Sequence, residues 1–143
     1  MRALVSMLIT AALAAAMPLA TQAAPAEPAT RGTVYLVGDS TMAPNTGYGN
    51  ALCARLQPQW ACVNLARGGR STLSYRTEGL WDALLQRLKA QPAQAAPPHV
   101  LIQFGHNDQP GKPGRSTDLA TEYPANLQRF VDEARAVGQV GGS

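Results

Sequence analysis

The apolar run TVYLVG at residues 33–38 constrains the fold of this chain more than any other feature. The run is rich in β-branched and aromatic residues, and it lacks the alternation of apolar and polar residues that a half-exposed strand shows. A strand of this kind is covered on both faces, as in a parallel sheet between two layers of helices. ACVNLA at 61–66 and HVLIQFG at 99–105 are predicted as a second and a third strand.

Stretches with helical spacing follow these strands. NALCARLQ at 50–57 is predicted as a short helix that Pro58 ends. A helix is also expected at 78–91, with Pro92 stopping it and with an apolar stripe of Leu80, Trp81, Leu84, Leu85 and Leu88. We interpret Trp81 as a core residue. Strands that alternate with helices in this way predict an α/β fold of βαβ units, with helices on both faces of the sheet.

The last part of this region is a Gly/Pro-rich loop at 110–117 followed by helical sequence up to residue 137. Thr117 or Asp118 is suited to cap a first helical segment there. The next segment is expected to bury a stripe that consists of Leu127, Phe130, Val131 and Ala134.

Both ends of the chain are expected to lie outside the folded domain. Residues 1–23 have Arg2, an apolar stretch and then small residues, which is typical of a secretory signal peptide. An uncleaved anchor helix is disfavoured, because no stop-transfer charges follow. We expect a Pro/Ala-rich linker at 24–32, the domain at 33–137 and an irregular tail at 138–143. The protein is therefore expected to be exported, periplasmic or secreted, with no stable membrane insertion after cleavage.

Charge and cysteine content exclude some classes of partner. The formal net charge is +3, and the basic residues are scattered, so nothing points to nucleic acid. Cys53 and Cys62 are the only cysteines, and in an exported chain such a pair predicts a disulfide. Neither has His or Cys neighbours at zinc-site spacing, so no metal is expected.

Polar residues follow the carboxyl end of each predicted strand, which is the edge where open α/β sheets bind ligands. The first loop brings Asp39-Ser40-Thr41, the second Gly68-Gly69-Arg70-Ser71 and the third Gly105-His106-Asn107-Asp108. A hydroxyl, a glycine-rich turn and an amide side chain are the parts of an acyl-transfer site. Each motif alone is also compatible with an ordinary turn or polar loop.

Three segments, YLVGDSTMA, NLARGGRSTLSYRTEGLWDALL and IQFGHNDQPGKPGR, closely resemble consecutive blocks of the SGNH (GDSL-type) hydrolase superfamily. Within it they are most similar to the rhamnogalacturonan acetylesterase group, over nearly all of 33–137. The resemblance implies a flavodoxin-like three-layer α/β/α fold that needs no cofactor. It also implies hydrolysis of acetyl esters on pectic polysaccharide or of another small ester. The G-x-S-x-G elbow of the α/β-hydrolases is absent, which disfavours that fold.

The resemblance assigns roles to individual residues. Ser40 is implied as the nucleophile, and its own N–H, the Gly69 N–H and the Asn107 side chain as the oxyanion hole. Asp39, Arg70 and Asp108 are interpreted as residues that support the loops.

The family's base is a His in an Asp-x-x-His element near the C-terminus, and no Asp of this chain has a His three positions later. His99 is expected at the opposite end of its strand, and His106 lies where the family does not place its base. We therefore predict a truncated or frame-shifted reading of a longer esterase gene, with a naturally short protein as the alternative. The third strand would then have an open edge, which predicts poor solubility or self-association.

Two other functions remain open from the sequence. A chain without a base could be a non-catalytic remnant, or a module that binds carbohydrate or a partner. A flavodoxin-type cofactor protein shares the architecture, but the chain has no phosphate-binding loop of a known type.

Overall fold

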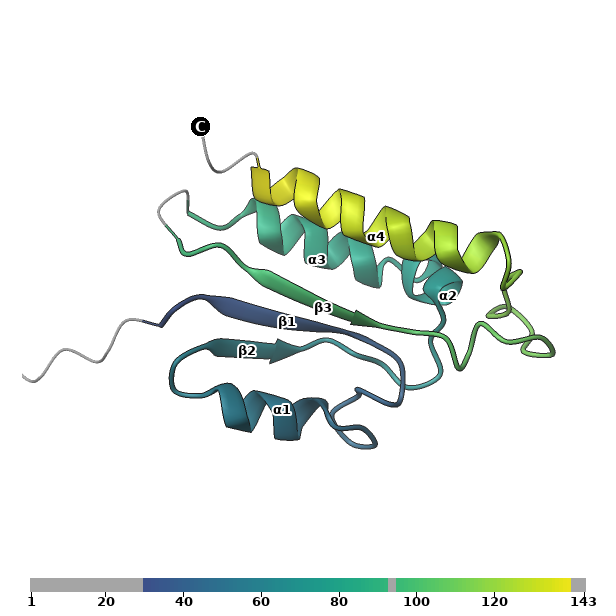
Figure 1. Cartoon of the computed structure of the whole chain (residues 1–143), viewed down its shortest axis with the longest axis horizontal. Coiled ribbons are helices and arrows are strands. Elements are labelled where there is room, and N and C mark those ends of the chain that lie inside the picture. Colours follow the sequence, from purple (N-terminus) through teal and green to yellow (C-terminus); the bar gives the residue numbers. More distant parts are fainter. Residues whose placement is uncertain (1–29, 93–94, 140–143) are drawn as a thin grey trace, which may run out of the picture.

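The computed structural model describes residues 30–92 and 95–139 (Figure 1). Three parallel strands form one sheet in the order β2-β1-β3. They are β1 (Thr33–Gly38), β2 (Ala61–Asn64) and β3 (His99–Gln103). Four consecutive residues of the central strand, Val34 to Val37, are buried, so the apolar run is covered on both faces as expected. The predicted signal peptide and most of the predicted linker lie outside the described residues.

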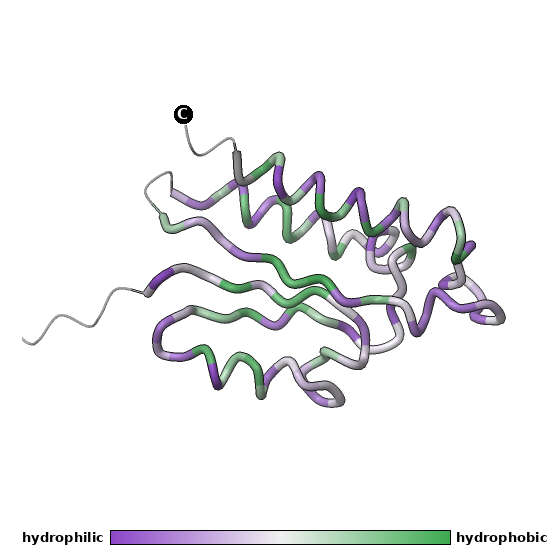
Figure 2. The backbone as a smooth tube through the Cα atoms, viewed as in Figure 1, coloured by the Kyte–Doolittle hydropathy of each residue, from purple (hydrophilic) through white to green (hydrophobic). Residues whose placement is uncertain are grey.

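Helices cover both faces of the sheet, which confirms the three-layer α/β/α prediction. Helix α1 (Gly49–Leu56) lies on one face, and α3 (Leu80–Lys89) and α4 (Glu122–Gln139) lie on the other (Figure 1). The short helix α2 (Thr72–Thr77) lies near the carboxyl ends of the strands. Figure 2 shows hydrophobic residues along the strands and hydrophilic residues in the loop that follows β3. None of the helices in the described part of the chain is long and apolar enough to cross a membrane.

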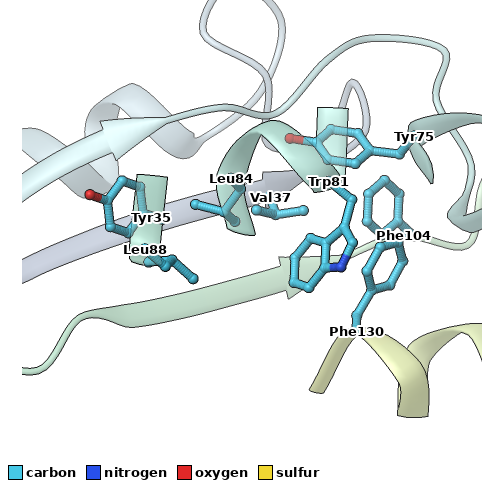
Figure 3. Close-up of a cluster of buried hydrophobic side chains, with 8 residues drawn as sticks. All are labelled: Tyr35, Val37, Tyr75, Trp81, Leu84, Leu88, Phe104 and Phe130. Atoms are coloured by element: carbon cyan, nitrogen blue, oxygen red, sulfur yellow. The ribbon is translucent and has the colours of Figure 1, made fainter. Parts of the chain in front are cut away.

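The larger core lies between the sheet and helices α2, α3 and α4. Its buried members, shown in Figure 3, are Tyr35, Val37, Tyr75, Trp81, Leu84, Leu88, Phe104 and Phe130. Trp81 is fully buried, as predicted, and its ring meets that of Phe130 edge to face at 4.5 Å between centroids. The indole Nε1 donates a hydrogen bond to Glu133 Oε2 at 2.6 Å, so the one polar atom of the ring is satisfied.

Glu133 joins α4 to the other two helices on this face. It accepts a hydrogen bond from Arg76 Nη1 at 2.9 Å in addition to the one from Trp81. Partial burial raises the pKa of Glu133. This effect is smaller than the combined lowering by the hydrogen bonds from Arg76 and Trp81 and by the charges of Arg76 and Arg129. The pKa of Glu133 therefore lies below its ordinary value, and the carboxylate is ionised at neutral pH.

The smaller core lies between the sheet and α1, and the predicted disulfide closes it. Val34, Leu36, Met42, Ala43 and Ala66 are its buried members. Cys53 in α1 is bonded to Cys62 in β2 with an S–S distance of 2.04 Å, which confirms the pairing. The sequence predicted a bridge at the end of the helix, but Cys53 lies in the middle of α1.

Several element boundaries differ from the predictions. The expected helix at 78–91 begins at Leu80, because Gly79 has a φ of +75°, and the separate helix α2 precedes it. The strands β2 and β3 each end two residues early, at Asn64 and Gln103. Asn64 stops β2 because its side-chain oxygen accepts a hydrogen bond from the Ala66 N–H at 3.1 Å.

Helix α4 also differs from its prediction. It continues to Gln139, two residues beyond the expected end of the domain, and the rest of the predicted tail lies outside the described residues. Phe130 is fully buried and Ala134 packs beside it, but Leu127 and Val131 are only partly buried and belong to neither core cluster of the described residues. Tyr123 and Val137 take their place in the stripe. Asp118 caps the turn before the helix, where its carboxylate accepts hydrogen bonds from the N–H groups of Ala120 and Thr121.

Candidate active site

The three polar loops meet at the carboxyl edge of the sheet, as the sequence predicts. The Asp39 N–H donates to the Gln103 carbonyl at 3.3 Å and the Arg67 N–H to the Gly38 carbonyl at 2.9 Å, so the strand ends are held together. A Cβ placed on Gly68 would lie 3.7 Å from the Cβ of Ser40. Asn107 reaches the second loop, where its Nδ2 donates to the Arg70 carbonyl at 3.0 Å.

Ser40 lies in a tight turn directly after β1. Asp39 is fully buried, and its Oδ1 accepts the Thr41 N–H at 2.8 Å, which fixes the turn from within. Gly38 permits the preceding close approach, because a Cβ there would lie 2.5 Å from the Gln103 carbonyl oxygen. The carbonyl of Ser40 accepts a hydrogen bond from Thr46 Oγ1 at 2.8 Å. The turn thus leaves the serine half-buried at the sheet edge, and these contacts agree with a supporting role for Asp39.

The second loop is a glycine turn that Arg70 holds in place. Gly69 has a φ of +79°, a conformation that other residues adopt at a cost. Arg70 Nη1 donates to the Gly68 carbonyl at 2.9 Å, and its Nη2 pairs with Glu78 Oε2 at 2.9 Å. Within the described residues, the N–H groups of Ser40 and Gly69 donate no hydrogen bond. Both are therefore available to an oxygen atom bound at this edge.

The third loop contributes Asn107 and is anchored by Asp108. Both side chains are buried, and the Asp108 carboxylate accepts from the N–H and the hydroxyl of Thr72, the first residue of α2. A second hydroxyl, that of Thr117, donates to Asp108 Oδ1 at 3.1 Å. The carboxylate thus joins the second loop, the third loop and the segment before α4. Asp108 therefore anchors the loop that carries Asn107.

The two histidines lie at opposite ends of β3, His99 at its first residue and His106 in the loop that follows it. His99 is the first residue of β3 and pairs in register with Val34, at the opposite end of β1 from Ser40. Its ring contacts Trp60 edge to face at 5.1 Å between centroids. His106 is exposed and makes no side-chain hydrogen bond within the described residues. No carboxylate there orients either ring.

Sequence reasoning missed residues of the 110–117 loop that contact the site. Arg115 Nη1 donates to the Gly69 carbonyl at 3.3 Å, and Lys112 Nζ donates to the His106 carbonyl at 2.6 Å. The segment GKPGR belongs to the third motif block, which was the available signal. Below this loop the Tyr123 hydroxyl donates to the Phe104 carbonyl at 2.9 Å. Burial raises the pKa of Tyr123, and the nearby charges of Asp108 and Asp39 raise it further.

No metal-ligand set is found at this edge. Across residues 30–92 and 95–139, no group of three or more His, Cys, Asp or Glu side chains could hold a metal ion.

Known proteins share sequence with most of the described chain. The model of the GDSL-like lipase/acylhydrolase family matches residues 36–140. A rhamnogalacturonan acetylesterase from Emericella nidulans is 42% identical over 77 residues, which are 53% of this chain and 28% of that protein. From Bacillus subtilis, the rhamnogalacturonan acetylesterase RhgT is 35% identical over 112 residues, 73% of this chain and 44% of its own length. The probable rhamnogalacturonan acetylesterase YesY is 31% identical over 112 residues, 73% of this chain and 49% of its own length.

A solved structure has the same fold. The crystal structure of protein YxiM from Bacillus subtilis superposes with a TM-score of 0.61 at 24% identity, and the match covers 78% of this chain and 32% of that chain. The chain thus spans half or less of the length of the proteins that it matches.

Proposed function

The chain belongs to the GDSL-like lipase/acylhydrolase family and is most like its rhamnogalacturonan acetylesterases, so we propose that it is an exported esterase region. In this proposal it removes acetyl groups from pectic polysaccharide, with Ser40 as the nucleophile. The observation that carries the proposal is the arrangement around Ser40. The serine, two backbone N–H groups without a partner in the described residues and the Asn107 amide come from three loops to one edge of the sheet. The signal-peptide pattern and the Cys53–Cys62 disulfide support export, because disulfides persist in oxidising compartments.

The chemistry follows from these groups. The Ser40 hydroxyl attacks the carbonyl carbon of the acetyl ester, and the carbonyl oxygen becomes an oxyanion. The N–H groups of Ser40 and Gly69 and the Asn107 amide stabilise that charge, since their dipoles are already oriented before the reaction. The base takes the proton of Ser40 and passes it to the sugar oxygen as the bond between that oxygen and the acetyl carbon breaks. Water then hydrolyses the acetyl-serine, which releases acetate and restores the Ser40 hydroxyl.

We propose that the base which activates Ser40 comes from outside these 143 residues. The sequence contains no Asp-x-x-His, and the positions of His99 and His106 support the proposal. Without a base the oxyanion hole and binding still accelerate hydrolysis over water, so slow turnover is compatible with this arrangement.

Labelling of Ser40 tests the proposed nucleophile. Because the chain has the proposed oxyanion hole without the base, we expect a serine-directed fluorophosphonate to modify Ser40 slowly and to leave Ser40→Ala unlabelled. Thr41→Ala is the matched control, because it removes the exposed neighbouring hydroxyl and leaves the backbone hydrogen bond to Asp39 in place. Mass spectrometry of the labelled peptide is the measurement.

Two outcomes would contradict this view. Equal labelling of the folded chain after Ser40→Ala, or no labelling of a longer form that supplies the base, would exclude Ser40 as the nucleophile. A loss of acetate release in His106→Ala would show that the base lies within the chain.

We also propose that the chain self-associates through the outer edge of β3. Within the described sheet β3 pairs only with β1, and Leu101 on it is 39% exposed. An apolar edge with unpaired N–H and carbonyl groups is a template for another strand. We expect Leu101→Lys to raise the monomer fraction in sedimentation velocity, whereas Leu119→Lys, an exposed leucine away from this edge, should not. A monomeric unsubstituted chain at micromolar concentration would refute the proposal.

A further inference from the structure

A cleft of about 610 Å³ lies beside the candidate active site. The end of β2 and the residues after it, Asn64 to Gly68, line one side. The loop 43–46 and helix α3 line the other sides of the cleft. The cleft reaches Gly68, where an added Cβ would lie 3.7 Å from that of Ser40. A ligand in the cleft would therefore extend away from the nucleophile along the open side of β2.

Two arginines give the cleft its charge. Arg67 lies on the loop after β2, and Arg87 lies in the last turn of α3, so both line the cleft. The lining includes no acidic residue. The ion pairs of the described residues use Arg70, Arg76 and Arg129 instead, and the side chains of Arg67 and Arg87 make no hydrogen bond there. The cleft thus has two cationic groups without counter-charges.

The position of Arg67 is supported by its effect on a buried neighbour. Tyr75 also lines the cleft, and its hydroxyl donates to the Leu65 carbonyl at 2.9 Å. Burial raises the pKa of Tyr75 to about 12, and the charge of Arg67 opposes that rise. The charge of Arg67 thus acts on the cleft wall at Tyr75, while Arg67 itself is exposed.

The rest of the lining suits a sugar. Leu80, Ala83 and Leu84 on α3 present apolar surface, while Asn45 and Thr46 on the facing loop present polar groups. Sugar rings combine apolar faces with hydroxyl groups, and a guanidinium matches the planar geometry of a carboxylate. Arg87 lies seven residues along α3 from Leu80, a rise of roughly 10 Å. The two cations come from different elements, Arg67 from the loop after β2 and Arg87 from the last turn of α3.

We propose that this cleft is a subsite for uronic acid units of the polysaccharide, with Arg67 binding the carboxylate nearer Ser40 and Arg87 one farther along. The inference rests on the proposed function, and it adds a basis for specificity: an acidic sugar neighbouring the acetylated unit positions the ester at Ser40. Neutral acetylated polysaccharides lack this contact. Binding is expected to weaken as salt is added, because both arginines are exposed.

Calorimetric titration of the full chain tests the subsite with two matched ligands. One is a galacturonate-containing rhamnogalacturonan oligosaccharide, and the other is the same oligosaccharide with its carboxyl groups reduced to primary alcohols. We expect the acidic ligand to bind at least about five-fold more tightly. Arg67→Gln and Arg87→Gln should each remove about five-fold of its affinity and leave that of the reduced ligand unchanged.

Arg55→Gln is the control variant, because Arg55 is an exposed arginine of α1 outside the cleft. Equal affinity for the two ligands, or an equal loss in the Arg55 and Arg67 variants, would overturn the subsite. Fluorophosphonate labelling of the unsubstituted chain reports the proposed function separately. Labelling of Ser40 without preference for the acidic ligand rejects the subsite alone, whereas preferential binding with labelling that Ser40→Ala leaves unchanged supports the subsite and rejects the nucleophile.

Discussion

Replacement of Asp108 by alanine is expected to lower the free energy of unfolding by about 3–5 kcal/mol and to reduce labelling of Ser40 strongly. The carboxylate is fully buried and accepts hydrogen bonds from the N–H and hydroxyl of Thr72 and from the hydroxyl of Thr117. Alanine leaves all three donors buried without an acceptor, and each such group costs about 1–3 kcal/mol. Asn107 and the Gly69 turn lose their common anchor at the same time.

Urea unfolding followed by circular dichroism measures the first effect, and the fluorophosphonate labelling rate measures the second. Asp108→Asn retains one carbonyl oxygen as an acceptor, so we expect a smaller loss of about 1–2 kcal/mol. Asp118→Ala is the exposed counterpart, because that carboxylate caps a turn at the surface, and its loss should destabilise the chain much less than the loss of Asp108. An Asp108→Ala variant that unfolds at the same urea concentration as the unsubstituted chain would contradict the assignment.

Replacement of Trp81 by alanine is expected to cost about 3–5 kcal/mol, a large part of the 5–15 kcal/mol that stabilises a typical domain. Trp81 is fully buried, and α3 and α4 meet at its contact with Phe130. The substitution leaves a cavity at this contact and removes the N–H that Glu133 accepts. Trp81→Phe retains an aromatic ring but lacks the hydrogen bond to Glu133. Its free energy of unfolding should therefore lie between that of the unsubstituted chain and that of Trp81→Ala.

Leu119→Ala is the matched control for this substitution. Leu119 is 47% exposed, and its truncation should change the free energy of unfolding by no more than about 0.5 kcal/mol. Equal urea midpoints for the Trp81 and Leu119 variants would show that the helix layer does not depend on Trp81. Thermal unfolding by circular dichroism supplies a second measurement of the same difference.

The central features of the fold were predictable because they depend on local sequence. The unbroken apolar run of β1 requires cover on both faces, and it starts and ends at the predicted residues, Thr33 and Gly38. The burial of Trp81 follows from helical spacing, and the Cys53–Cys62 bridge from the presence of only two cysteines. The meeting of the three loops follows from the parallel direction of the strands.

The features that were missed depend on contacts between distant residues. Helix α2 has only six residues, and its first N–H is satisfied by Asp108, which lies 36 positions further along the chain. Arg115 reaches Gly69 across 46 positions. The hydrophobic residues of the sequence predicted that Leu127 and Val131 belong to the buried stripe of α4. In the structure Tyr123 and Val137 pack against the larger core instead. No local pattern contains this information.

The order of the strands makes assembly of the site depend on the most distant pairing in the sheet. Val34 is opposite Cys62, 28 residues later, in one neighbouring strand, and opposite His99, 65 residues later, in the other. The longer closure costs roughly 0.7 kcal/mol more chain entropy, and non-local pairing of this kind slows folding. Asn107 and Asp108 follow the strand that is recruited by this longer closure. Partly folded chains that contain only β1 and β2 therefore have Ser40 without Asn107, so the proposed oxyanion hole is complete only after β3 has joined the sheet.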